Sequence, residues 1–88
     1  MSKMSTTRTE TEMTVNLKEE DSINRIRSMM AEINHPRIVS TRKYKQKMII
    51  CYKYSTETGI ADKVKTRNYI RGMVRALVWI DSKDEEKE

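Results

Sequence analysis

The sequence predicts a small two-layer α+β domain with the element order β-α-β-β-(β)-α, an antiparallel sheet with two amphipathic helices on one face. Three observations lead to this prediction. The chain has 88 residues, which leaves room for one domain with one modest core. It contains two Gly and one Pro, so helices and strands should fill most of the ordered part. Its apolar side chains recur with a period of two in some segments and with helical spacing in others.

The first expected element is a strand. Over residues 7–18, Thr side chains followed by Met13 and Val15 fall on one side and polar side chains on the other. A period of two is typical of a strand. Only the second half offers core-forming side chains, so the packed strand is placed at residues 12–18. The Thr-rich stretch 1–11 is expected to be a flexible N-terminal segment.

A helix should follow. Ile23, Ile26 and Met30 recur at helical spacing. The acids before them suit the positive end of the helix dipole, and Ser22 offers a capping hydroxyl. Pro36 ends the helix, because proline disfavours helical geometry in the residue before it.

Two strands are expected next. Residues 37–41 are rich in β-branched side chains, and residues 48–54 have the highest strand propensity in the chain. The polar segment 43–47 connects them, so the two strands are interpreted as a hairpin. Residues 60–65 are interpreted as an optional third, polar strand of this part of the sheet.

The last element is a second amphipathic helix. Thr66 is its expected N-cap, Ile70 and Leu77 lie on its apolar face, and it should end near Asp81. Gly72 interrupts this pattern, and glycine inside a helix costs about 1 kcal/mol relative to alanine. The glycine therefore predicts either a neighbour that packs closely against it or a break in the helix.

Domain limits follow from these elements. Residues 12–81 are expected to form the single α+β domain. Residues 82–88 contain no apolar side chain and are expected to be an acidic disordered tail.

Charge is distributed unevenly along the chain. Residues 23–80 hold 13 Lys and Arg against three acids, whereas residues 1–22 carry a net charge of −2 and residues 81–88 one of −3. No acid occurs between Asn34 and Ser55. The total of +5 therefore combines a folded part of charge +10 with two acidic ends.

The basic residues form two groups. Those around the hairpin are Arg37, Arg42, Lys43, Lys45, Lys47 and Lys53, with Tyr44 among them. Those on and before the last helix are Lys63, Lys65, Arg67, Arg71 and Arg75. Lys and Arg bind backbone phosphates, and tyrosine stacks on unpaired bases. These residues predict a small nucleic-acid-binding accessory or regulatory protein that recognises DNA or RNA with weak sequence specificity.

Other interpretations stay open. Tyr52 and Tyr54 share a face with Ile50, so they are also candidates for the core. The basic surface equally suits an acidic partner protein, which would make the chain an inhibitor or adaptor. Two basic groups on one face would favour nucleic acid, whereas groups that point apart would weaken that hypothesis. If the first strand is exposed, it leaves a free sheet edge, which is often covered by a second copy of the chain, so a homodimer is expected.

Several classes of protein are not expected. One cysteine, Cys51, and one histidine, His35, are too few for a structural zinc site. Cys51 lies among apolar residues, which is typical of an inert thiol, and no phosphate-binding or metalloprotease motif occurs. We therefore expect neither an enzyme nor a cofactor. No apolar run approaches the roughly 20 residues of a membrane helix, and no signal-peptide pattern is present, so a cytoplasmic location is expected.

One resemblance concerns the order of elements. The expected α-β-β-β-α order over residues 22–81 is similar to that of double-stranded-RNA-binding domains, which place lysines at the start of their last helix. Lys63, Lys65 and Arg67 occupy that zone. The Lys-Lys-x-Ala-Lys run of those domains is absent, and Ile70 stands where a small residue would be. The likeness is one of element order, and it assigns no family.

Overall fold

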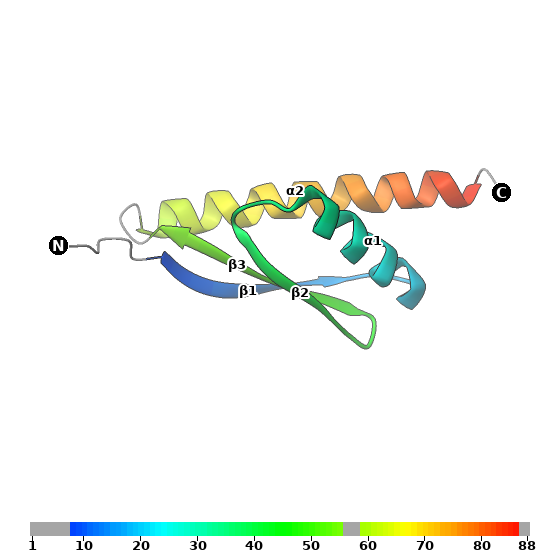
Figure 1. Cartoon of the computed structure of the whole chain (residues 1–88), viewed down its shortest axis with the longest axis horizontal. Coiled ribbons are helices and arrows are strands. Elements are labelled where there is room, and N and C mark those ends of the chain that lie inside the picture. The colour runs from blue at the N-terminus through cyan, green and yellow to red at the C-terminus, as the bar shows by residue number, and fades with distance from the viewer. Residues whose placement is uncertain (1–7, 56–58, 87–88) are drawn as a thin grey trace.

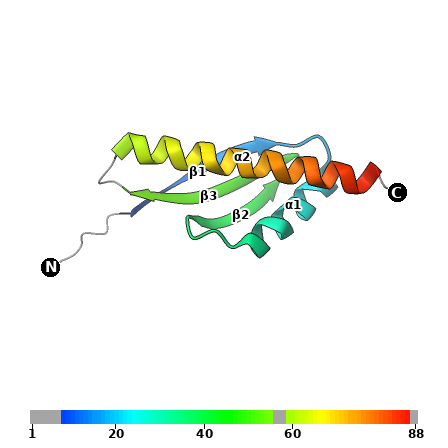
Figure 2. The ribbon, with the colours of Figure 1, turned by 90° about the horizontal axis from the view of Figure 1, so that it is seen from above.

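The computed structural model of the protein describes residues 8–55 and 59–86. They form a three-stranded antiparallel sheet with two helices on one face (Figure 1, Figure 2). The elements are β1 (Arg8–Asn16), α1 (Glu20–Ile33), β2 (Ile38–Tyr44), β3 (Lys47–Ser55) and α2 (Gly59–Glu86). β3 lies in the middle of the sheet, so β1 and β2 are its two edges. The predicted two-layer α+β architecture is therefore confirmed.

The core lies between the sheet and the helices. Every second side chain of β3 is buried, and Met13 of β1 lies opposite Ile50 of β3 on the same face. Tyr52 is 1% exposed, so it is a core aromatic rather than a base-stacking one. Tyr54 packs against the core as a partly buried side chain. The buried apolar residues are Met13, Ile23, Ile26, Met30, Met48, Ile50, Tyr52, Ile70, Val74 and Leu77.

The first strand is longer than its apolar residues indicate. β1 begins at Arg8, not at residue 12, because Thr9 and Thr11 pair with Tyr54 and Tyr52 of β3. Residues 8–11 therefore belong to the sheet rather than to a flexible segment. The rest of that predicted segment, residues 1–7, lies outside the described residues.

The prediction of an optional strand at residues 60–65 was wrong. α2 begins at Gly59 and includes these residues. Ile60 and Val64 are 78% and 46% exposed, so neither side chain is buried in the core. The sheet therefore has one strand fewer than the order that resembles double-stranded-RNA-binding domains.

Both helices extend further than predicted. α2 continues to Glu86, so residues 82–86 are helical rather than a disordered tail, and residues 87–88 lie outside the described residues. α1 starts at Glu20, and its N-cap residue Glu19 makes no side-chain capping bond. The predicted cap Ser22 lies inside the first turn, where its hydroxyl accepts a 3.1 Å hydrogen bond from Arg25 Nη2.

Gly72 fits neither explanation offered from the sequence. The helix runs through it without a break, and a Cβ added there would meet nothing within 4 Å. The residue lies on the exposed side of α2. No packing contact therefore offsets the cost of a glycine inside the helix.

Two carboxylates of α2 fasten this helix to the rest of the fold. Asp81 is 5% exposed and accepts hydrogen bonds from Arg25 of α1. Asp62 accepts from the backbone N–H of Ser55 at 2.7 Å and from Arg37 at 2.6 Å. The pKa of Asp81 is lowered mainly by the Arg25 hydrogen bond, and that of Asp62 mainly by the Ser55 hydrogen bond and then by Arg37. Both contacts thus favour the charged form.

Candidate anion-binding groove

A groove of about 410 Å³ lies between α2 and the edge strand β1. α2 packs on the central strand β3, and its flank beyond β3 faces β1 (Figure 2). One wall is formed by Lys63, Arg67 and Arg71 of α2, here called the basic flank. The other wall and the floor are formed by Thr11, Glu12, Met13, Thr14 and Tyr52. The groove therefore places three cations beside the edge of a sheet.

Helix geometry explains which bases of α2 enter the groove. Residues four apart lie about 40° apart around an α-helix, because one turn takes 3.6 residues. The row that starts at Lys63 therefore drifts around the helix by about 120° before it reaches Arg75. Arg75 does not line the groove. Lys65 lies on the other side of α2, where it lines a hollow with His35 and Tyr69.

The guanidinium groups of the basic flank form no ion pair with a described acid, and Glu12, which also lines the groove, is paired with Arg42 instead. Arg67 and Arg71 are exposed and make no hydrogen bond or ion pair within residues 8–55 and 59–86. Lys63 places its Nζ 5.6 Å from the ring centroid of Tyr54, a cation–π contact. Burial raises the pKa of Tyr52, and the positive charge of Arg67 opposes that shift. Arg67 and Arg71 are therefore exposed to an anionic ligand, and the half-buried Lys63 lies beside them.

By contrast, three of the six hairpin bases form ion pairs with acids among the described residues. Arg37 binds Asp62 and Thr66 and so holds β2 to α2, which makes it a structural residue. Arg42 Nη2 lies 3.2 Å from Glu12 Oε2, across the face of the sheet that the helices leave open. Lys43 Nζ lies 2.9 Å from a carboxylate oxygen of Glu20 in α1. Sequence separation hid these pairs, because each joins residues more than 20 positions apart.

The remaining hairpin residues lie apart from the groove. Lys45 adopts a left-handed φ of 57° in the turn, and its Nζ lies 5.4 Å from the ring centroid of Tyr44. Lys47 and Lys53 alternate with the buried residues of β3, so they lie on the face of the sheet opposite the helices, and Lys53 pairs with Glu10. The twelve predicted contact residues are thus divided among several faces of the molecule.

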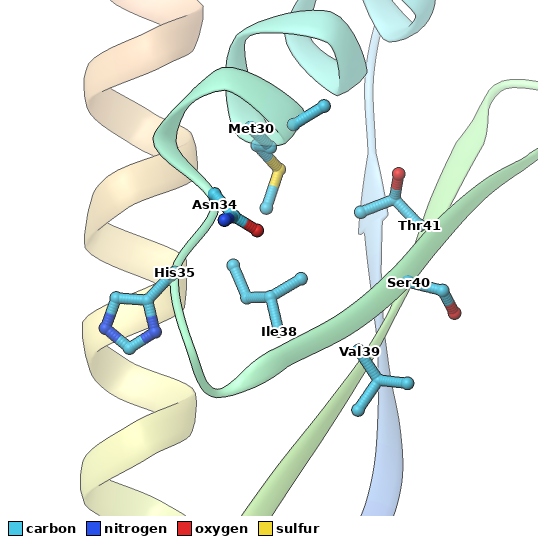
Figure 3. Close-up of a pocket in the computed structure, with 8 residues that line it drawn as sticks. Met30, Asn34, His35, Ile38, Val39, Ser40 and Thr41 are labelled. Carbon is cyan, nitrogen blue, oxygen red and sulfur yellow. The ribbon is translucent and has the colours of Figure 1, made fainter.

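Other hollows offer less chemistry. One of about 240 Å³ lies between the C-terminal end of α1 and β2, lined by residues such as Met30, Ile38 and Ser40 (Figure 3). No Lys, Arg, Asp or Glu is among its described lining residues. Figure 3 shows His35 turned toward α2, and the His35 ring lies 5.0 Å from that of Tyr69.

Cys51 and His35 do not form a catalytic pair. Cys51 lies on the open face of the sheet, with its Sγ 3.8 Å from Glu10 Oε1, whereas His35 lies in the helical layer and accepts a hydrogen bond from the Arg37 backbone N–H. Burial, followed by the charges of Glu10 and Glu12, raises the pKa of the Cys51 thiol, which opposes formation of a thiolate nucleophile. The described part of the chain contains no cluster of His, Cys, Asp and Glu suited to a metal ion.

Sequence reasoning raised an exposed edge at the first strand, but it missed that this edge lies beside the basic flank. The signal for the strand was the alternation of threonines over residues 9–14, which predicted a strand but not its neighbours. Comparisons with protein-family models, curated proteins and solved structures found no match to the chain. Neither described helix has the length and apolar composition needed to cross a lipid bilayer.

Proposed function

We propose that the protein is a non-enzymatic binding protein that engages an acidic partner protein through the basic flank. The observation that carries this proposal is the groove itself, where Arg67 and Arg71 face solvent without an acidic partner among the described residues. Complementary charge accelerates encounter and sets the orientation of a partner. An inhibitor or adaptor that acts by occupying an acidic surface needs no further chemistry.

Nucleic acid is the second candidate, favoured by the net charge of +10 over residues 23–80. Two features make it the weaker one. The hairpin bases and the basic flank lie on different faces, so they do not form one continuous surface. Tyr44 is 56% exposed but belongs to β2, at the opposite edge of the sheet from the groove. Among the described residues, no exposed aromatic ring lines the groove for base stacking.

The test compares the affinity for an acidic peptide with that for nucleic acid, and it compares charge reversal inside the groove with charge reversal outside it. Fluorescence anisotropy measures binding of a labelled acidic peptide of alternating Glu and Thr, and of DNA and RNA oligonucleotides of equal charge. The site variant carries Arg67→Glu and Arg71→Glu. The control variant carries Lys65→Glu and Arg75→Glu, the same charge change on the same helix but outside the groove. Circular dichroism verifies that both variants are folded.

We expect the peptide to bind the native protein more tightly than either nucleic acid. The site variant should lose about tenfold or more in affinity, equivalent to about 1.4 kcal/mol, and the control much less. Binding should weaken as salt is added, because exposed charges are screened. Equal losses in both variants, or no binding of the peptide at low salt, would contradict the proposal. Tighter binding of an oligonucleotide would favour the second candidate.

A further inference from the structure

We infer that the groove receives an extended acidic segment of the partner, which pairs with the free edge of β1 as a fourth strand. This inference rests on the proposed function and specifies the mode of binding. It combines the basic flank with the backbone of β1, the two walls of the same groove.

The edge of β1 has the properties of a strand acceptor. On one side β1 pairs with β3 over its whole length, from Arg8 opposite Ser55 to Asn16 opposite Lys47. On its other side no described strand pairs with it. An edge strand presents unpaired N–H and C=O groups that can hydrogen-bond to another chain, and extended peptides are bound in this way. The groove follows this edge at residues 11–14.

The spacing of the cations fits an extended ligand. From Lys63 to Arg71 the helix rises about 12 Å, at about 1.5 Å per residue. In a strand, three successive side chains on one face span about 13 Å, because each residue advances the chain by about 3.3 Å. A strand laid along β1 therefore places three alternate side chains near the three cations. Carboxylates at these positions would complement the basic flank.

The other face of the added strand would meet a different charge. Glu10 and Glu12 of β1 are exposed and lie on the side of the sheet that the helices leave open. Their basic neighbours, Lys53 opposite Glu10 and Arg42 paired with Glu12, lie toward β3 and β2, away from the free edge. Like charges on adjacent strands are destabilising, whereas opposite charges attract. The fitting peptide therefore has acidic residues at alternate positions and neutral or basic residues between them.

The β1 strand of a second protein molecule should bind this edge less well than such a peptide. An antiparallel β1 pair would bring Glu10 and Glu12 of the two copies onto adjacent strands. It would also bring the two basic flanks together without an anion between them. Charge repulsion therefore disfavours a homodimer formed through the first strand, whereas charge attraction favours the binding of an acidic strand there.

The experiment separates strand pairing from attraction of charge alone. The labelled Glu-Thr peptide, about ten residues long as strands commonly are, is compared with two N-methylated forms. In one form every Glu nitrogen is methylated, and in the other every Thr nitrogen. Successive N–H groups of a strand point to opposite sides, so only one form blocks the hydrogen bonds to β1. A fourth peptide has the same composition with all Glu residues in one block.

We expect one N-methylated form to bind at least about tenfold more weakly than the other, which corresponds to a loss of about 1.4 kcal/mol in binding free energy. The affinity of the other form should stay near that of the unmethylated peptide. The block peptide should also bind more weakly than the alternating one. Equal affinities of the two N-methylated forms, whether high or low, overturn strand addition. The proposed function stands if the parent peptide still binds and the Arg67→Glu/Arg71→Glu variant does not. Sedimentation of the protein without peptide tests whether a second copy of the chain occupies the β1 edge. A monomer agrees with the inference, whereas a dimer that the Thr11→Pro substitution abolishes contradicts it.

Discussion

Arg25 of α1 and Asp81 of α2 are joined by two hydrogen bonds, from Nε to Oδ1 at 2.6 Å and from Nη2 to Oδ2 at 3.0 Å. They connect residues 56 positions apart and hold the C-terminal part of α2 to α1. Asp81 is buried, whereas 41% of the Arg25 side-chain surface remains exposed. The pair anchors α2 one turn beyond Leu77, the last buried apolar residue of the helix.

Replacement of Asp81 by alanine should destabilise the fold by about 1–2 kcal/mol. A charged hydrogen bond contributes about 1.5–3 kcal/mol, and the exposure of Arg25 reduces this value by solvent screening. Urea unfolding followed by circular dichroism measures the change. The exposed neighbour Ser82, replaced by alanine, is the control and should stay within about 0.5 kcal/mol of the native protein. Equal stability of the two variants would show that the ion pair contributes nothing.

Acid should weaken the fold through Asp62 and Asp81. The folded state lowers the pKa of both carboxyls below the ordinary value of 3.8. The stabilisation is therefore fully present above the ordinary pKa and is lost as pH falls through the lowered folded-state values. Urea unfolding between about pH 6 and pH 2 should show this loss below about pH 4. A variant with Asp62→Asn and Asp81→Asn should have a flatter profile there; an unchanged slope would argue against these two residues.

Alanine at position 72 should stabilise the protein. Gly72 lies in an intact, exposed stretch of α2 with nothing within 4 Å of an added Cβ. Alanine favours a helix over glycine by about 1 kcal/mol, which raises the melting temperature of a domain this small by roughly 4–8 °C. Thermal melts of the Gly72→Ala variant measure the gain. A lower melting temperature would mean that the space beside Gly72 is occupied in solution.

Cys51 should react slowly with alkylating reagents near neutral pH. Burial, then the charges of Glu10 and Glu12, raises the pKa of its thiol above the usual 9.0. The rate of alkylation by iodoacetamide should therefore be lower in the folded protein than in urea, and its midpoint should lie at higher pH. Glu10→Gln together with Glu12→Gln should move the midpoint back toward lower pH. A midpoint that does not respond to these substitutions would refute the electrostatic part of this explanation.

Most of the fold could be predicted because the elements have a clear period or a strong local propensity. Alternation identified β1, strand propensity identified β3, and the spacing of Ile70, Val74 and Leu77 identified α2. The start of α2 was missed because its first turns bury little apolar surface: Ile60 and Val64 face solvent, so no apolar face marks this part of the helix. The local sequence does not contain the tertiary contact of Asp62 with Arg37 and Ser55 that fixes this end.

The candidate site could be predicted only in part. Spacing by four along the chain identified Arg67 and Arg71 as neighbours on one side of a helix. It also grouped them with Arg75, which does not line the groove, and it left Lys63 before the helix rather than on it. Sequence could not show that Arg37 is a structural residue, because its partner Asp62 is 25 positions away. Nor could it show that β1 is an edge strand beside α2, because strand order depends on the packing of the whole sheet.

Mapping of the peptide contact tests the central claim most directly. Amide chemical shifts of the isotope-labelled protein are recorded during titration with the alternating Glu-Thr peptide. The groove predicts that the largest changes fall on residues 11–14 of β1 and residues 63–71 of α2, with small changes around the turn at Lys45. Changes confined to the hairpin, or spread evenly over all basic residues, would contradict the assignment of the groove as the binding site.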